Sequence, residues 1–329
     1  MRILLHLLMA WAFSQSLAAQ MAIPASMGSI DNASKNWSAE VYSFELDGGL
    51  IMVNGRAGDK SGKYILDTGA PTLILNSNVY SSDQKSERAF GLSGSARLQS
   101  LRVKDFEVAN IQQEKIKAYT TDISHIEKVK NRPIEGLLGY EAIKSKEIMI
   151  DYEKQQIAFM DVTDPYGQMM DKEVVDQLPF RYRDHLPIVK VRIGKRTYYF
   201  GIDTGAEANI INVRLKKRMR KFSDKEYNSR LLQGVDPSQA EALSTTLKEI
   251  KIKGHSFEDL EFVFANIYYI NRNHDILLDG ILGAPFLKSR TFSINFKDKK
   301  LKIWEDIPSI DPHLPAPQKE ALAKSTQQE

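Results

Sequence analysis

The sequence contains the same motifs twice, in the same order. Asp67-Thr68-Gly69-Ala70 recurs 136 residues later as Asp203-Thr204-Gly205-Ala206. A second motif, Leu137-Leu138-Gly139, follows an acidic residue and a glycine, and it recurs 144 residues later as Ile281-Leu282-Gly283. The same offset of 144 relates the strand-like segments that follow both copies. Ordered motifs separated by one eight-residue insertion indicate a duplicated fold rather than a chance similarity.

The duplication divides the chain of 329 residues into two halves. Each half contains short apolar, β-branched segments bounded by turn residues and few helical patterns, so the predicted fold class is mainly β. We predict that the halves span 40–162 and 178–305, with a turn-rich linker at 163–177. Residues 306–329 contain four prolines followed by charged residues and glutamine, which is typical of a disordered tail.

The start of the chain has the three parts of a secretory signal peptide. Arg2 supplies a positive charge, residues 3–13 are mostly apolar, and small residues follow before position 20. We therefore expect a signal peptide at 1–19, a loose leader at 20–39, and export to the periplasm or the extracellular space. The alternative is a buried N-terminal helix. No later segment approaches the run of about 20 apolar residues that a membrane span requires, so we expect no transmembrane segment in the mature chain.

The amino-acid composition excludes several kinds of functional site. The absence of cysteine excludes disulfides, thiolate zinc sites, iron–sulfur clusters and a cysteine nucleophile. The balance of 45 Lys+Arg against 42 Asp+Glu argues against nucleic acid as the main partner. The six histidines show no metal-binding spacing, and we expect no metal or organic cofactor.

One segment is strongly basic. The cations between Arg214 and Lys221 alternate with Leu215, Met219 and Phe222, which are spaced as on one face of a helix. This pattern predicts an amphipathic helix with a solvated cationic face. The alternative is a surface that attracts acidic lipid or polymer.

The two Asp-Thr-Gly segments can be explained in two ways. A single copy fits ordinary turn chemistry, because aspartate accepts hydrogen bonds from nearby backbone amides. Two copies at matching places suggest a shared site instead. Duplicated halves tend to pack about a pseudo-twofold axis, which would bring Asp67 and Asp203 together. Two adjacent carboxylates cannot both ionise, so one can act as a base while its protonated partner acts as an acid.

Both motifs resemble the active-site elements of clan AA aspartic proteases. Leu137-Leu138-Gly139 and Ile281-Leu282-Gly283 resemble the hydrophobic-hydrophobic-Gly element that completes the ψ-shaped loop of that family. The segment around Asp203 is especially similar to the retropepsin-like form, and Asp279–Gly283 with Phe286-Leu287 is similar to bacterial members. The resemblance implies two retropepsin-like β-barrel lobes fused in one chain, related by a pseudo-twofold axis, with the active site between them.

The resemblance also implies roles for the loop residues. Asp67 and Asp203 would be the catalytic carboxyl groups, and the supporting loop residues would be Thr68, Gly69, Ala70, Thr204, Gly205 and Ala206. The two threonines would brace the loops across the interface, and the two glycines would allow close backbone approach. Many pepsin-like enzymes carry Ser or Thr where this chain has Ala70 and Ala206. Without that hydroxyl donor the pKa values of the dyad should stay higher, which predicts an activity optimum in weak acid to near-neutral solution.

The sequence departs from the family pattern at two places. Pro71-Thr72 follows the first loop and Glu207-Ala208 the second, so we expect an asymmetric cleft. Phe90–Gly94 and Gln233–Val235 are the best candidates for flap hairpins that close over a substrate, with ordinary turns as the alternative. A flap tyrosine like that of pepsin has no clear equivalent.

The sequence as a whole predicts an exported, monomeric aspartic endopeptidase that hydrolyses peptide or protein substrates. Water activated between Asp67 and Asp203 would be the nucleophile. The alternative is a protein of the same fold that is catalytically silent and binds peptides or serves as a scaffold in the cell envelope.

Overall fold

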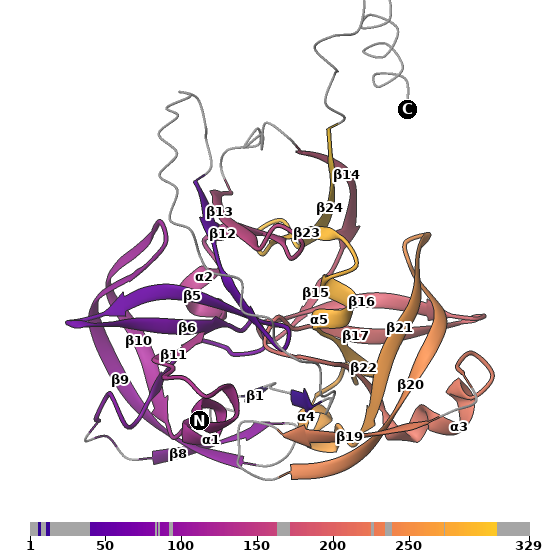
Figure 1. Cartoon of the computed structure of the whole chain (residues 1–329), viewed down its shortest axis with the longest axis horizontal. Helices are drawn as coiled ribbons and strands as arrows, with labels where there is room; N and C mark the ends of the chain where they lie inside the picture. Colours follow the sequence, from indigo (N-terminus) through magenta and orange to yellow (C-terminus); the bar gives the residue numbers. More distant parts are fainter. Residues whose placement is uncertain are drawn as a thin grey trace, which may run out of the picture.

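The structure, a computed structural model, describes residues 6–7, 11–13, 40–82, 84, 86–91, 95–162, 172–224, 227–233, 239–272 and 274–307. These residues form two β lobes that lie side by side below a third sheet (Figure 1). Each lobe is a mixed sheet that curls until distant strands pair. The predicted fold class, mainly β with two pepsin-like lobes, is confirmed.

The N-terminal lobe is a nine-stranded sheet. In spatial order its strands are β4 (Glu45–Asp47), β5 (Leu50–Ala57), β6 (Lys60–Leu66), β11 (Gly136–Leu138), β7 (Leu73–Asn76), β10 (Ile111–Thr121), β9 (Ser95–Val108), β8 (Ser86–Gly91) and β1 (His6–Leu7). An additional pairing of β5 with β9 closes the sheet on itself.

The C-terminal lobe repeats this order strand for strand. Its strands are β15 (Arg181–Arg183), β16 (Leu186–Ile193), β17 (Arg196–Ile202), β22 (Gly280–Leu282), β18 (Asn209–Asn212), β21 (His255–Ala265), β20 (Gln239–Ile252), β19 (Asn228–Gln233) and β2 (Trp11–Phe13). The pairing of β16 with β20 closes this sheet in the same way. Apart from β1 and β2, which pair with their neighbours in opposite directions, the strands of the two lobes have the same order and directions, and this supports the duplication that the motifs predict.

Alternation of side chains explains how these strands form half-buried sheets. In β16, Val189, Val191 and Ile193 are buried, whereas Lys190 and Arg192 between them are exposed. Successive side chains of a strand point to opposite faces, so one face of β16 packs into the lobe and the other meets solvent.

A third sheet joins the halves. Its six strands, in order, are β14 (Lys172–Pro179), β24 (Lys300–Asp306), β23 (Thr291–Asn295), β12 (Lys146–Asp151), β13 (Gln156–Asp161) and β3 (Val41–Ser43). At its centre β12 and β23, one from each half, pair antiparallel with Ile148 opposite Ile294. Residues 172–177, expected in the linker, lie in β14, so part of that segment is an edge strand of the sheet.

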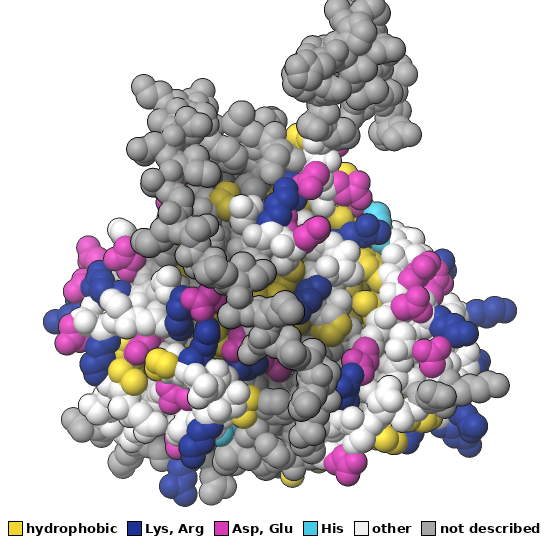
Figure 2. All heavy atoms as spheres, in the orientation of Figure 1, with side chains coloured by type: hydrophobic (Ala, Val, Ile, Leu, Met, Phe, Trp, Pro, Cys, Tyr) yellow, Lys and Arg dark blue, Asp and Glu magenta, His cyan; other side chains and the backbone are white. Residues whose placement is uncertain are grey.

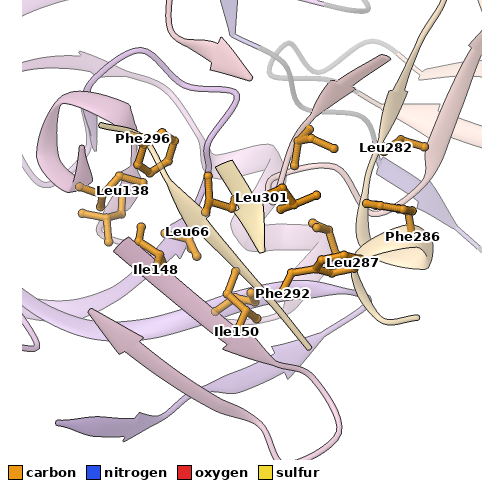
Figure 3. Close-up of a cluster of buried hydrophobic side chains, with 14 of the residues drawn as sticks. Leu66, Leu138, Ile148, Ile150, Leu282, Phe286, Leu287, Phe292, Phe296 and Leu301 are labelled. Atoms are coloured by element: carbon orange, nitrogen blue, oxygen red, sulfur yellow. The ribbon is translucent and has the colours of Figure 1, made fainter. Parts of the chain in front are cut away.

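The largest hydrophobic core runs from this sheet into both lobes. Leu66 and Leu138 of one lobe, Ile148 and Ile150 of the shared sheet, and Leu282 and Phe286 of the other lobe belong to one cluster (Figure 3). Full burial of such a side chain contributes about 1.5–3 kcal/mol. The two lobes are therefore fixed to each other by apolar packing as well as by hydrogen bonds.

The helices are short, and two pairs follow the duplication. Helix α1 (Ser124–Lys130) corresponds to α4 (Tyr268–Asn271), and α2 (Tyr140–Ile143) corresponds to α5 (Ala284–Leu287). None of the described helices is long and apolar enough to cross a membrane.

The basic segment forms an insertion that the N-terminal lobe lacks. The connection from β18 to β19 spans 213–227, six residues more than the connection 77–85 from β7 to β8. It contains a 3₁₀ turn, η1 (Val213–Leu215), followed by one helical turn, α3 (Lys216–Met219). The predicted amphipathic helix is therefore shorter than expected and ends at Met219, which is its buried residue. Consecutive cations three and four positions apart repel one another and disfavour a longer helix.

The two ends of the chain are described only in part. Of the predicted signal peptide, the structure describes only β1 and β2, which pair with β8 and β19. The predicted leader at 20–39 and residues 308–329 of the predicted tail lie outside the described residues. The signal peptide and the tail stay predictions.

Candidate active site

Asp67 and Asp203 occupy corresponding places in the two lobes. Asp67 directly follows β6, and Asp203 directly follows β17. The backbone N–H of Asp67 donates to the carbonyl of Leu138 at 3.0 Å, and that of Asp203 donates to the carbonyl of Leu282 at 3.0 Å. The hydrophobic motif of each lobe thus holds the backbone of the aspartate in the same lobe.

The glycine that ends each hydrophobic motif is required by the close packing of the chain. A Cβ at Gly139 would lie 2.7 Å from the carbonyl oxygen of Ala70 and still closer to that of Thr72. A Cβ at Gly283 would meet the carbonyl oxygen of Ala208 at 2.6 Å. These distances are shorter than side-chain carbons tolerate. Any other residue would therefore push the loop that carries the aspartate out of place.

The two threonines join the loops across the interface between the lobes. The N–H of Thr68 donates to Oγ1 of Thr204 at 3.0 Å, and the N–H of Thr204 donates to Oγ1 of Thr68 at 3.1 Å. Each hydroxyl then donates to a carbonyl of the opposite lobe, that of Thr68 to Ile202 and that of Thr204 to Leu66. These reciprocal bonds relate the loops by a pseudo-twofold axis.

The carboxyl groups of Asp67 and Asp203 lie together at this axis, 0% and 1% exposed. A Cβ at Gly69 would lie 2.6 Å from Oδ2 of Asp203, and a Cβ at Gly205 would lie 2.5 Å from Oδ1 of Asp67. The side chain of each aspartate therefore contacts the loop of the other lobe. Only glycine leaves room for this approach.

Backbone amides fix the orientation of both carboxyl groups. Oδ1 of Asp67 accepts the N–H groups of Gly69 at 2.9 Å and Ala70 at 3.0 Å, whereas Oδ1 of Asp203 accepts the N–H of Gly205 at 2.9 Å. Oδ2 of each aspartate is buried and has no hydrogen-bond donor among the described residues. The two Oδ2 atoms thus retain free lone pairs on the side where the carboxyl groups meet.

Burial dominates the acid–base behaviour of the pair. Desolvation raises the pKa of Asp67, and it raises the pKa of Asp203 together with the neighbouring charge of Asp67. Backbone amides of the loops oppose this rise for both carboxyl groups. A pair of this kind holds one proton between two carboxyl groups.

Two further side chains reach the loops from the opposite lobe, and the sequence did not single them out. Lys130, at the end of α1, forms an ion pair with Glu207 and a second one with Asp47 at 3.1 Å. Burial raises the pKa of Glu207 in spite of this cation. His185 lies within hydrogen-bonding distance of the loop of Asp67, with Nε2 2.8 Å from the carbonyl oxygen of Gly69. The asymmetry at Glu207 was visible in the sequence, but the partners of Glu207 and Gly69 were not.

The expected flap hairpins exist as paired strands. Strand β8 pairs with β9, and β19 pairs with β20, both antiparallel. The tips of these hairpins, 92–94 and 234–238, lie outside the described residues. Closure of the flaps over a substrate therefore stays a prediction.

The comparison with known families agrees with this geometry. Residues 189–286 match the family model described as "Aspartyl protease". This segment runs from β16 to α5 and contains both Asp203 and Ile281-Leu282-Gly283. No curated protein matches the chain. Residues 189–286 of the C-terminal half are therefore similar to aspartyl proteases, and the N-terminal half repeats the topology of that segment.

Proposed function

We propose that the protein is an aspartic endopeptidase whose active site is formed by Asp67 and Asp203, one from each half. The observation that carries this proposal is the meeting of two buried carboxyl groups at the pseudo-twofold axis, held by matching loops. Burying two carboxyl groups against each other costs stability, because neither can keep its charge at its usual pKa. Such an arrangement is typical of a catalytic site rather than a structural one.

The geometry supports hydrolysis by an activated water. The ionised carboxylate removes a proton from the water, whose oxygen attacks the carbonyl carbon of the scissile peptide bond. The protonated carboxyl group donates a hydrogen bond to the carbonyl oxygen and polarises the bond. The resulting tetrahedral intermediate collapses when the amine takes from the first carboxyl group the proton that came from the water, and leaves, which restores the singly protonated pair. No covalent bond forms between enzyme and substrate.

The ends of the two lobe sheets offer a way to hold the peptide. Strand β1 pairs with β8 in parallel and β2 pairs with β19 antiparallel, so the N-terminal segment adds a strand to each lobe. Extended peptides bind to open sheet edges by the same backbone hydrogen bonds. Cleavage of the expected signal peptide at 1–19 would leave both edges open for a substrate. Removal of the signal peptide during export therefore fits the proposed activity. Mass analysis of the mature N-terminus tests whether the signal peptide is removed.

A mixed peptide library tests the function directly. The purified protein should cleave a subset of the peptides, and in ¹⁸O-labelled water each new C-terminal carboxyl group should gain one labelled oxygen. Retention of peptides by the protein without any cleavage across the pH range would support the catalytically silent alternative instead. The close approach of the two buried carboxyl groups favours the enzyme, because separated carboxyl groups could not share a proton.

A further inference from the structure

The loop that carries Asp67 is held by a side chain from the other lobe. His185 lies in the turn between β15 and β16 and is 8% exposed. Its Nε2 lies 2.8 Å from the carbonyl oxygen of Gly69, and because a carbonyl can only accept, Nε2 must carry the proton. The imidazole ring also packs against Tyr140 of α2, with ring centroids 6.2 Å apart.

This hydrogen bond ends on a peptide group that also contacts the dyad. The carbonyl of Gly69 and the N–H of Ala70 belong to one peptide unit, and that N–H donates to Oδ1 of Asp67 at 3.0 Å. Hydrogen bonds in a chain polarise one another. A donor on the carbonyl of Gly69 therefore makes the Ala70 amide a stronger donor to the carboxylate of Asp67.

The second lobe cannot form the same chain. The offset of 136 places Gly49 at the position that corresponds to His185, and glycine has no side chain that could donate. The N–H of Ala206 lies 3.4 Å from the main-chain oxygen of Asp203, and the carboxyl oxygen Oδ1 of Asp203 accepts from Gly205. Oδ1 of Asp67 thus accepts two amides of its own loop and Oδ1 of Asp203 accepts one, and the amide of Gly69 also lowers the pKa of Asp203.

We propose that His185 is a positioning residue that decides which aspartate carries the charge, an inference that rests on the proposed peptidase activity. By polarising the Ala70 amide it stabilises negative charge on Asp67. Asp67 is then the base that activates water, and Asp203 is the protonated acid that polarises the substrate.

His185 fulfils this role as a neutral ring. Burial lowers the pKa of His185, and the charged groups that face it act in opposite directions. Asp184 in its own turn and Glu141 of α2 favour the protonated ring, whereas Arg183 of β15 disfavours it. Protonation of Nδ1 would leave the proton on Nε2 in place, so the donor to Gly69 is present in both forms of the ring.

Two substitutions of nearly equal shape test the proposal. His185→Gln keeps an N–H donor at the position of Nε2, whereas His185→Met fills similar space without a donor. The Met variant should raise the pKa of Asp67, so the low-pH limb of kcat/KM should move to higher pH. The expected displacement is roughly 0.2–0.6 on the pH scale, from 10–30% of one hydrogen bond to a charged group. The Gln variant should keep the wild-type profile.

A second readout makes the result independent of turnover. The ¹³C NMR titration of the aspartate carboxyl carbons, assigned with Asp67→Asn, should show the same upward displacement for Asp67 in the Met variant. His185→Phe keeps a ring against Tyr140 and provides another donor-free variant should His185→Met fold poorly. Identical titrations in the Gln variant and both donor-free variants would overturn the proposal. If the wild type cleaves no peptide, the peptidase proposal fails, and the carboxyl titration still decides the role of His185.

Discussion

At the scale of the residue, two aspartates with the same sequence context have different surroundings. Asp67 faces two amides of its own loop, one of them in the peptide group held by His185, whereas Asp203 accepts from one amide of its loop. The proposed catalysis needs this difference, because one carboxyl group must be ionised while the other is protonated. Desolvation raises both pKa values, and the charge of Asp67 raises the pKa of Asp203 further, whereas backbone amides lower both.

The raised pKa values predict how stability depends on pH. In the folded protein both carboxyl groups have pKa values above those of the unfolded chain. Their contribution to the free energy of unfolding is therefore fully present below the unfolded values, and it is lost as pH rises through the folded values. A tenfold change in the acid dissociation constant between the two states corresponds to about 1.4 kcal/mol. Activity should accordingly peak in weak acid to near-neutral solution.

Urea denaturation measures this linkage. The wild type should lose stability, relative to the Asp67→Asn/Asp203→Asn double variant, as pH rises from weakly acidic to weakly alkaline. The double variant has no carboxyl group to ionise at the site and serves as the control. Parallel stability curves for the two proteins would show that the carboxyl groups titrate as exposed ones do.

The sequence identifies the residues of the dyad but not His185. Asp67 and Asp203 are visible because each belongs to a repeated motif, and the threonines that brace them are visible for the same reason. His185 belongs to no motif, and its partner is a backbone carbonyl 116 residues away in the chain. Such a contact depends on how the lobes pack, which a single sequence does not encode in any local pattern. The alignment of His185 with Gly49 is the sequence signal that could have drawn attention to it.

At the scale of the element, the hydrophobic motif is the part of each lobe that tolerates least change. Gly139→Ala and Gly283→Ala should each reduce stability by about 1–3 kcal/mol, because the added methyl group meets backbone oxygens that cannot move independently. Activity should fall further than stability, since Leu138 and Leu282 hold the backbone of the aspartates.

Thermal unfolding and kcat/KM of the two glycine variants check this expectation. Gly254→Ala is the control, because its Cβ would meet nothing within 4 Å and only the positive φ of +100° is strained. A Gly139→Ala variant with wild-type stability and activity would show that the motif is not under the packing constraint described above.

The length of the insertion in the C-terminal half could be predicted from the sequence, but its position could not. The change of offset from 136 to 144 locates eight extra residues between the motifs, and the structure divides them. Six lie in the connection with η1 and α3, and two lie between β19 and β20, where 234–238 corresponds to 92–94. The cations Arg214, Lys217, Arg218, Arg220 and Lys221 line a hollow of about 610 Å³. Dark blue side chains gather at the lower right of Figure 2, where Figure 1 places α3.

At the scale of the whole molecule, the halves are joined by more than the dyad. The sequence predicts a linker between two lobes, but residues 172–177 form part of β14, and six strands from both halves share one sheet. Pairing between strands of distant segments depends on the registers that the assembled molecule permits, so neither β14 nor the pairing of β12 with β23 could be derived from local patterns.

The buried ion pair between Lys130 and Glu207 is a second connection, from α1 of one lobe to the catalytic loop of the other. Their side chains are 5% and 3% exposed. Lys130→Met should therefore lower the free energy of unfolding by about 3–5 kcal/mol, because it leaves the carboxylate of Glu207 buried without its cation. The double variant Lys130→Met/Glu207→Met should recover most of this loss.

Urea denaturation of both variants provides the test. Lys154→Met is a matched control, since the ion pair of Lys154 with Asp306 is exposed and should contribute about 0–1 kcal/mol. A double variant that is less stable than Lys130→Met alone would contradict the explanation that Lys130→Met destabilises the fold by leaving the carboxylate of Glu207 without its cation.

The central claim is that Asp67 and Asp203 form one catalytic unit contributed by both halves. The most direct test is kcat/KM for peptide cleavage by the wild type, Asp67→Asn, Asp203→Asn and the double variant, all at matched folding. Each single substitution should reduce kcat/KM by at least about a hundredfold, because it removes half of one acid–base pair. The double variant should be hardly worse than either single one, since effects within one unit are not additive. Equal activity in the wild type and either single variant would contradict the claim.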